Sequence, residues 1–366
     1  SFPLSIFNSI ITAHEKFVYI KIINLLRTIL NPAIMITVLL FGSRAFGMVI
    51  GSTVFNILLG LVNVIYCFKI LKLKIKFAGF DKALFAEIFN YSFFVFLSAI
   101  AYQIYWNSDQ LILAIFVGAA PIAIYAVSSQ FNTYFLSLSN VLSSMFLPKL
   151  TKMVTVEENR NDLMRLLTKI GRIQYYICSY IFVGFVLVGK QFIVRWVGTG
   201  YSFCYVIAII LMFPQIFSII QSLFATMLEA MNKHRVKAYI YLSIAIINIL
   251  LSIVLVQKYQ GLGCAIGTAI GMIINAVANN IYYKFVIKLD IKYFWMNILK
   301  LVVPTSITFG LGFLALSLFS LTSYISILMF GILFTIIYFI VFWIMGFNKY
   351  EKKIFISVLN KGRIKQ

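Results

Sequence analysis

The stretch YSFFVFLSAIAYQIYWNSDQLILAIFVG, residues 91–118, decides the fold class because it holds one charged residue, Asp109, in an otherwise uncharged and mostly apolar run. A run of about 20 apolar residues is long enough to cross a bilayer as a helix. A carboxylate in hydrocarbon is costly or loses its charge. The stretch therefore predicts a membrane-spanning helix whose acid needs an explanation.

The rest of the chain continues this pattern. The 366 residues are 62% hydrophobic and 11% charged, with a mean hydropathy of +0.98, far more apolar than a soluble domain. A net charge of +21 would suggest a nucleic-acid partner in a soluble protein. Here the bases alternate with runs of spanning length, so we expect membrane lipid and no nucleic acid. We predict an all-α polytopic membrane protein.

Ten complete spans and one partial span are predicted. The chain has no initiator Met and opens inside an apolar run, SFPLSIFNSIITA, which we interpret as the end of a helix in an N-terminally truncated fragment. The complete spans follow at 18–41, 44–68, 88–118, 120–147, 173–189, 203–228, 238–257, 262–287, 297–319 and 322–347.

Charge in the loops orients these spans. One alternating set of loops holds 26 of the 31 Lys and Arg residues, and the other set holds four. Positive loops stay in the cytoplasm. We therefore expect a multi-pass protein with a cytoplasmic C-terminus.

An internal repeat predicts two lobes. At an offset of 217 residues, the segment around Lys16 and Asn31 aligns with the segment around Lys233 and Asn248. The matched helices lie six spans apart, so the copies share one orientation and an axis along the membrane normal. This arrangement is typical of a transporter with a midplane cavity between lobes.

Polar faces mark two consecutive spans. The candidates for binding substrate are Gln103, Asn107, Asp109 and Gln110 on the first, and Ser129, Thr133, Ser137 and Asn140 on the second. Such faces either make interhelical hydrogen bonds or line a hydrated cavity, and we favour the cavity. Asp109 either couples an ion or is a carboxylate at the outer interface, satisfied by neighbouring amides. We favour the interface.

Arg27 lies about ten residues inside its span, with Asn24 and Asn31 nearby. An intramembrane Arg marks a site by default, and its forked donors suit phosphate oxygens. It could equally extend to the cytoplasmic interface, and the sequence does not decide between these interpretations.

We predict no cofactor, no metal site and no catalysis. The four Cys lie within or beside apolar runs, the two His lie in basic loops, and neither set has metal-ligand spacing. The connections are too short to hold a catalytic domain.

The segments NYSFFVFLSAIAYQIYWNSDQLILAIFVGAAPIAIYAVSSQ (90–130) and VLSSMFLPKLTKM (141–153) resemble bacterial polysaccharide flippases of the O-antigen (Wzx) type. These belong to the multidrug/oligosaccharidyl-lipid/polysaccharide exporter superfamily. The similarity is carried by the pattern Asp-x-x-Ile-Leu-x-x-x-x-Gly at 109–118, then Tyr125 and Pro148.

The resemblance implies two pseudo-symmetric six-helix lobes (MATE-like) plus a C-terminal helix pair. The expected parts are the end of the N-terminal lobe (1–68), a basic cytoplasmic linker (69–87), the C-terminal lobe (88–288), the extra helix pair (289–347) and a basic tail (348–366). It also implies a flippase that moves an undecaprenyl-pyrophosphate-linked oligosaccharide across the bacterial inner membrane by alternating access, alongside polysaccharide-assembly proteins. Arg27 is then the candidate for pyrophosphate, and the Ser, Asn and Gln faces for sugar.

Two alternatives stay open. A cation-coupled drug antiporter of the same superfamily would use intramembrane acids, of which Asp109 is the one clear example. A membrane-embedded polysaccharide polymerase would show a large external loop with catalytic side chains, whereas the predicted outer loops are short.

Overall fold

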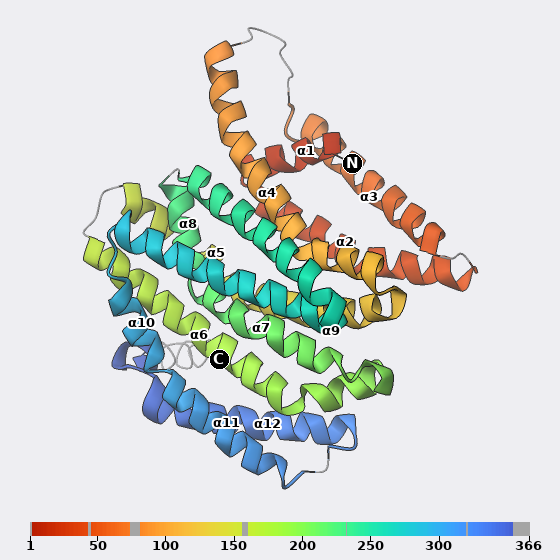
Figure 1. Ribbon diagram of the computed structural model, residues 1–366. Coiled ribbons are helices and arrows are strands. Elements are labelled where there is room, and N and C mark those ends of the chain that lie inside the picture. Colours follow the sequence, from red (N-terminus) through yellow and green to blue (C-terminus); the bar gives the residue numbers. More distant parts are fainter. Residues whose placement is uncertain are drawn as a thin grey trace, which may run out of the picture. The chain divides into compact units, whose positions relative to one another are not determined.

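A computed structural model describes residues 2–42, 45–73, 81–155, 160–231, 233–319 and 321–353 (Figure 1). Eight helices of this part of the chain are long and apolar enough to cross a membrane. The prediction of an all-α polytopic membrane protein is confirmed. The chain forms two compact units, residues 1–82 and 83–366.

The first unit is a three-helix assembly of α1 (Phe2–Ala13), α2 (Phe17–Leu40) and α3 (Ala45–Lys69). Both α1 and α2 pack on α3. The Tyr19 hydroxyl donates to Asn63 Oδ1 at 3.0 Å, and the Tyr19 and Tyr66 rings stack with centroids 3.8 Å apart. Gly51 lets α3 approach Ile34 and Val38, because a Cβ there would lie 3.3 Å from Val38.

The second unit is larger and contains the remaining helices. These are α4 (Lys82–Phe116), α5 (Ala119–Thr155), α6 (Arg160–Trp196), α7 (Cys204–Ile220), α8 (Ser222–Ala230), α9 (His234–Phe285), α10 (Ile291–Leu299), α11 (Val302–Leu316) and α12 (Tyr324–Val341). A short 3₁₀ turn, Thr199–Tyr201, precedes α7, and a π-helical turn, Phe342–Gly346, follows α12.

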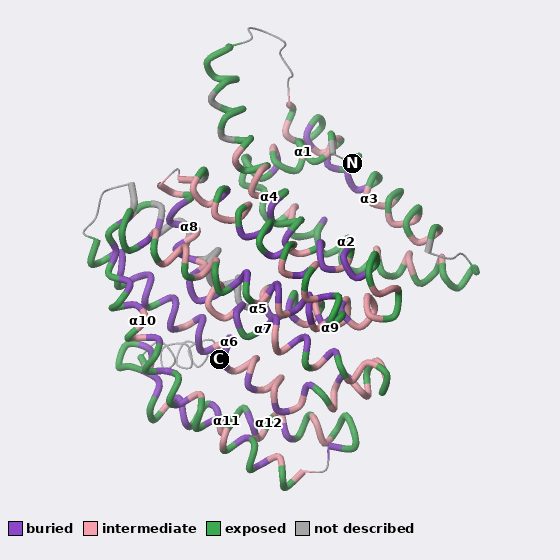
Figure 2. The backbone as a smooth tube through the Cα atoms, viewed as in Figure 1, coloured by how far each residue is buried: buried purple, intermediate pink, exposed green. Residues whose placement is uncertain are grey.

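Helix α7 is central in this unit, where it packs against α5, α6 and α9. Buried residues concentrate in α6 and α7, whereas α11 and α12 expose most of their apolar side chains (Figure 2). A helix surrounded by protein must bury all its faces, while a peripheral apolar helix can face lipid. The main core joins α6 and α8 to α10, α11 and α12 around Phe224, Phe294 and Phe330.

Several helices are longer or more broken than the predicted spans. The predicted spans 238–257 and 262–287 are the two halves of α9, which bends at Gln260, where φ is +49°. The predicted span 203–228 is divided into α7 and α8 at Gln221. Predicted span 120–147 lies within α5, which is not one of the eight apolar helices.

Glycines of α9 allow its two halves to pack closely. A Cβ on Gly263 would lie 2.3 Å from the carbonyl oxygen of Leu255, and one on Gly267 would lie 2.7 Å from Ser252 Oγ. Small residues permit such backbone approach in membrane helices. The glycine spacing in this span therefore serves helix packing.

Candidate functional site

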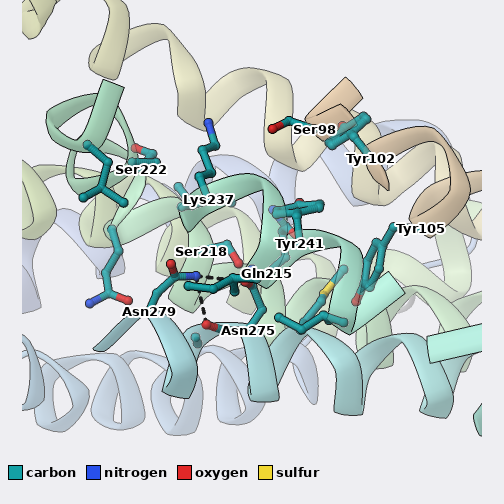
Figure 3. Close-up of a pocket in the computed structure, with 18 of the residues that line it drawn as sticks. Ser98, Tyr102, Tyr105, Gln215, Ser218, Ser222, Lys237, Tyr241, Asn275 and Asn279 are labelled. Carbon is teal, nitrogen blue, oxygen red and sulfur yellow. Dashed lines mark hydrogen bonds between the residues drawn. The ribbon is translucent and has the colours of Figure 1, made fainter. Parts of the chain in front are cut away.

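A cavity of about 450 Å³ lies within the second unit, among α4, α5, α7, α8 and α9 (Figure 3). Its polar lining comes mainly from hydroxyls and carboxamides, and its apolar lining from aromatic and aliphatic side chains. The polar and aromatic residues are Ser98, Tyr102, Tyr105, Trp106, Gln215, Ser218, Gln221, Ser222, Lys237, Tyr241, Asn275, Asn279 and Tyr283.

Helical spacing places the amides and hydroxyls together. Gln215, Ser218 and Ser222 recur three or four residues apart on α7 and the start of α8, so they share one face. Asn275 and Asn279 are one turn apart on α9, and Asn279 Nδ2 donates to Asn275 Oδ1 at 2.8 Å. Figure 3 shows Gln215 and Ser218 beside this asparagine pair.

Two polar groups at this cavity have no hydrogen-bond partner among the described residues. Gln215 is 4% exposed, yet its carboxamide makes no hydrogen bond there. The indole Nε1 of Trp106 is also buried without an acceptor. A buried donor left unpaired costs about 1–3 kcal/mol. Such groups are therefore suited to bind a polar ligand.

An aromatic wall faces the amides. Tyr102, Tyr105 and Trp106 come from α4, and Tyr241 comes from α9. The Tyr105 and Trp106 ring centroids are 5.5 Å apart at an interplanar angle of 81°, and the Tyr102 and Tyr241 rings stack at 6.3 Å. Mutual packing restrains these rings, so they offer a preformed apolar wall.

The cavity carries little net charge. Lys237 is the one charged residue that lines it in the described part of the chain, and its Nζ lies 2.5 Å from Glu229 Oε1. The ion pair links the end of α8 to the first turn of α9. Paired in this way, Lys237 presents no unbalanced charge to a ligand.

Asp109 lies outside the cavity lining, in a hydrogen-bonded network between α4, α5 and α9. It is 1% exposed and accepts hydrogen bonds from the hydroxyls of Tyr125, Ser252 (3.0 Å) and Thr268 (2.5 Å). Asn248 borders the network, because its Oδ1 lies 3.1 Å from Ser252 Oγ and 3.2 Å from Thr268 Oγ1 and is the alternative acceptor for each hydroxyl proton. Three hydroxyl donors satisfy the carboxylate, where the sequence suggested neighbouring amides.

The other predicted residues of this unit also lie outside the cavity lining wherever their side chains are described. Gln103 and Asn107 are exposed and bond to each other at 2.9 Å, and Gln110 is half-buried. The hydroxyls of Ser129, Thr133 and Ser137 each donate to a carbonyl three or four residues earlier on α5. The side chain of Asn140 lies outside the described residues.

In the first unit, Asn24 and Arg27 are exposed on α2. Asn31 is half-buried, and its Oδ1 has no partner among the described residues. At 100° per residue, Arg27 falls within the same arc of α2 as Tyr19, Ile34 and Val38, which contact α3.

Sequence reasoning missed the cavity residues of α7, α8 and α9. Their signal was present: Gln215, Ser218 and Ser222 in one apolar span, and Asn275 and Asn279 in another, have helical spacing. The sequence located the cavity-lining side of α4 in part. Ser98, Tyr102 and Trp106 line the cavity and lie on the same helix as the predicted residues Gln103 and Asn107, which do not line it.

Comparisons with known proteins agree with this fold. Residues 2–154 match the model of a family described as "Polysaccharide biosynthesis protein". The structure titled "Lipid II flippase MurJ, inward closed conformation" is similar, with a TM-score of 0.64 and 20% identity, covering 86% of this chain and 67% of that chain. No curated protein matches. The family match and the similar fold agree with the resemblance to polysaccharide flippases found in the sequence.

Proposed function

We propose that this multi-pass membrane protein is a flippase that moves a lipid-linked oligosaccharide across the bacterial inner membrane by alternating access. The observation that carries the proposal is the near-neutral cavity of amides, hydroxyls and aromatic rings inside a chain with the flippase fold. We infer an undecaprenyl-pyrophosphate carrier, a role in surface polysaccharide assembly and a cytoplasmic C-terminus. The proposal includes no catalytic step.

The cavity lining favours a sugar over a lipophilic cation. Sugar hydroxyls both donate and accept hydrogen bonds, as do carboxamides and hydroxyls, and pyranose rings present C–H faces to aromatic side chains. A cationic drug inside a membrane protein needs a carboxylate to balance its charge. No Asp or Glu lines the cavity in the described part of the chain, and the oxygens of Asp109 are engaged elsewhere.

The internal repeat supports Arg27 as the pyrophosphate ligand. The offset of 217 residues pairs Asn24 with Tyr241 and Arg27 with Ile244, and both partners line the cavity of the second unit. If the lobes are pseudo-symmetric, Asn24 and Arg27 correspond to these two cavity-lining positions, and both are exposed on α2. The fork of an Arg binds phosphate oxygens bidentately.

The lobe and helix-pair boundaries inferred from the sequence are part of the same proposal. In this scheme residues 1–68 end the N-terminal lobe, 69–87 link the lobes, and 88–288 form the C-terminal lobe. Residues 289–347 form the added helix pair, and 348–366 form the tail.

Reconstitution tests the function directly. The full-length protein would be placed in vesicles that contain undecaprenyl-pyrophosphate-linked N-acetylglucosamine in both leaflets, and an impermeant glycosyltransferase would modify the outer-leaflet lipid. We expect modification of nearly all the lipid with protein present and about half without it. Equal modification in both cases contradicts the proposal.

The Arg27→Ala variant tests the pyrophosphate assignment in the same assay. We expect flipping at least about tenfold slower, because a charge-assisted pair is lost. Lys21→Ala, on the same helix nearer the cytoplasmic loop, is the matched control and should flip normally. Normal flipping by Arg27→Ala would show that Arg27 does not bind the pyrophosphate, and it would not contradict the flippase function.

A further inference from the structure

The ion pair at the edge of the cavity has an unusual position. Lys237 lines the cavity, whereas Glu229 does not, and the two are joined at 2.5 Å across the turn between α8 and α9. The Lys237 side chain is 32% exposed and that of Glu229 is 45% exposed, so neither charge needs a partner merely to be tolerated. The acid nevertheless balances the one positive charge that lines the cavity in the described part of the chain.

Arg235, two residues before Lys237, also has a partner. The Arg235 guanidinium lies 5.0 Å from the centroid of the Phe94 ring, and Arg235 does not line the cavity. A site for a diphosphate would need uncommitted cations or several convergent backbone amides. This cavity therefore suits a part of the substrate that has no charge.

The polar groups that have no partner among the described residues define how that part is held. The Gln215 carboxamide supplies one acceptor and two donors, and the Trp106 indole supplies one donor. They belong to α7 and α4, two of the helices that enclose the cavity. A ring hydroxyl or an acetamido group can accept a hydrogen bond from the Trp106 indole and exchange hydrogen bonds with the Gln215 carboxamide. The aromatic wall would then contact the face of the sugar ring.

We infer that this cavity is a saccharide subsite for an uncharged pyranose. Glu229 sets the specificity of the subsite, because it neutralises Lys237 and so weakens the binding of acidic sugars. The inference rests on the proposed flippase function and adds to it the charge class of the sugar. A site built to hydrogen-bond a ligand discriminates strongly against one that leaves those bonds unmade.

Sugar binding to the purified full-length protein in detergent tests this inference without transport. The probes are methyl α-D-glucopyranoside and the matching methyl glucuronide, titrated by saturation-transfer NMR. We expect the wild type to prefer the neutral glycoside by at least about fivefold. Gln215→Leu should weaken neutral binding about tenfold, as loss of one needed hydrogen bond implies.

Substitution of Glu229 gives the change in sugar preference that is specific to this inference. Glu229→Gln leaves Lys237 unpaired, so the preference should shift at least about fivefold toward the glucuronide. The double variant Glu229→Gln/Lys237→Gln removes both charges and should restore the neutral preference. Asp162→Asn, which breaks an exposed pair with Arg165 on α6, is the matched control and should not shift it.

The outcomes separate the two proposals. If the wild type binds neither sugar, or if Glu229→Gln keeps the wild-type preference, the subsite inference is overturned even if lipid flipping is intact. If sugar binding and the charge shift occur as expected but vesicles show no flipping, the subsite stands and the flippase function fails. Unchanged thermal unfolding of each variant confirms that its fold is preserved.

Discussion

Arg172 of α6 binds both carboxylate oxygens of Glu351, which lies 179 positions later in the chain. Its Nε is 2.7 Å from Oε1, and its Nη2 is 3.0 Å from Oε2. The Tyr176 hydroxyl also donates to Glu351 Oε2, at 2.7 Å, and Arg172 donates to the carbonyl of Gly346. The pair fixes the segment after α12 against α6.

Replacing Arg172 should destabilise the protein strongly. Arg172→Leu leaves a buried carboxylate with fewer donors, and breaking one partner of a buried pair costs about 3–5 kcal/mol. Arg165→Leu is the control on the same helix, because its pair with Asp162 is exposed and is worth at most about 1 kcal/mol. Thermal unfolding in detergent measures both. Equal melting temperatures for the two variants would contradict a structural role for Arg172.

Acid should remove the contribution of Glu351. Burial acts to raise the pKa of Glu351, but hydrogen bonds from Arg172, the Asn348 amide and Tyr176 outweigh it and hold that pKa below its usual value. A carboxyl with a lowered pKa stabilises the fold above the unfolded pKa of about 4.3, and this is lost as pH falls through the folded pKa.

The difference in melting temperature between wild type and Glu351→Gln should therefore be constant from about pH 5 to pH 8 and should shrink below about pH 4. Other carboxyls titrate in both proteins, so the difference isolates Glu351. A difference that grows on acidification would show that its pKa is raised instead.

Glycine substitution should separate packing from helix propensity. Gly263→Ala places a Cβ 2.3 Å from the Leu255 carbonyl oxygen, and such overpacking costs about 1–3 kcal/mol or more. Gly310→Ala in α11 meets no atom within 4 Å and should be neutral or stabilising by up to about 1 kcal/mol. Similar unfolding curves for the two variants would argue against close packing within α9.

Asp109 should act first as a structural residue. Asp109→Leu leaves the hydroxyls of Tyr125, Ser252 and Thr268 without their acceptor, and each unmet buried donor costs about 1–3 kcal/mol. Asp109→Asn keeps one acceptor oxygen and should lose less. A leucine variant that melts like the wild type but flips no lipid would show that Asp109 is needed for transport and not for stability.

The sequence identified the elements well because each is defined by local chemistry. Apolar runs of spanning length, such as 91–118, must become helices in a bilayer to satisfy their own backbone. The break within α9 lies between two spans predicted separately, beside Gln260 and Gly261. The π-turn after α12 and the division at Gln221 have no comparable local signal.

The cavity was harder to predict because it depends on which faces meet. Gln103 directly follows Tyr102, and Asn107 directly follows Trp106, yet of these four only Tyr102 and Trp106 line the cavity. A rotation of 100° per residue separates neighbouring side chains, so a broad polar arc does not reveal which of its edges faces inward. Packing of α4 against α9 decides it.

Composition and hydropathy by themselves determined that this chain is a multi-pass helical membrane protein, because the hydrophobic effect and backbone hydrogen bonding act on each segment separately. Tertiary structure decided what its polar residues do. It placed Asp109 among three hydroxyls, paired Lys237 with Glu229, and left the Trp106 indole nitrogen at the cavity with no partner among the described residues. Those roles depend on side chains brought together from different helices, and the sequence of one helix alone does not specify its neighbours.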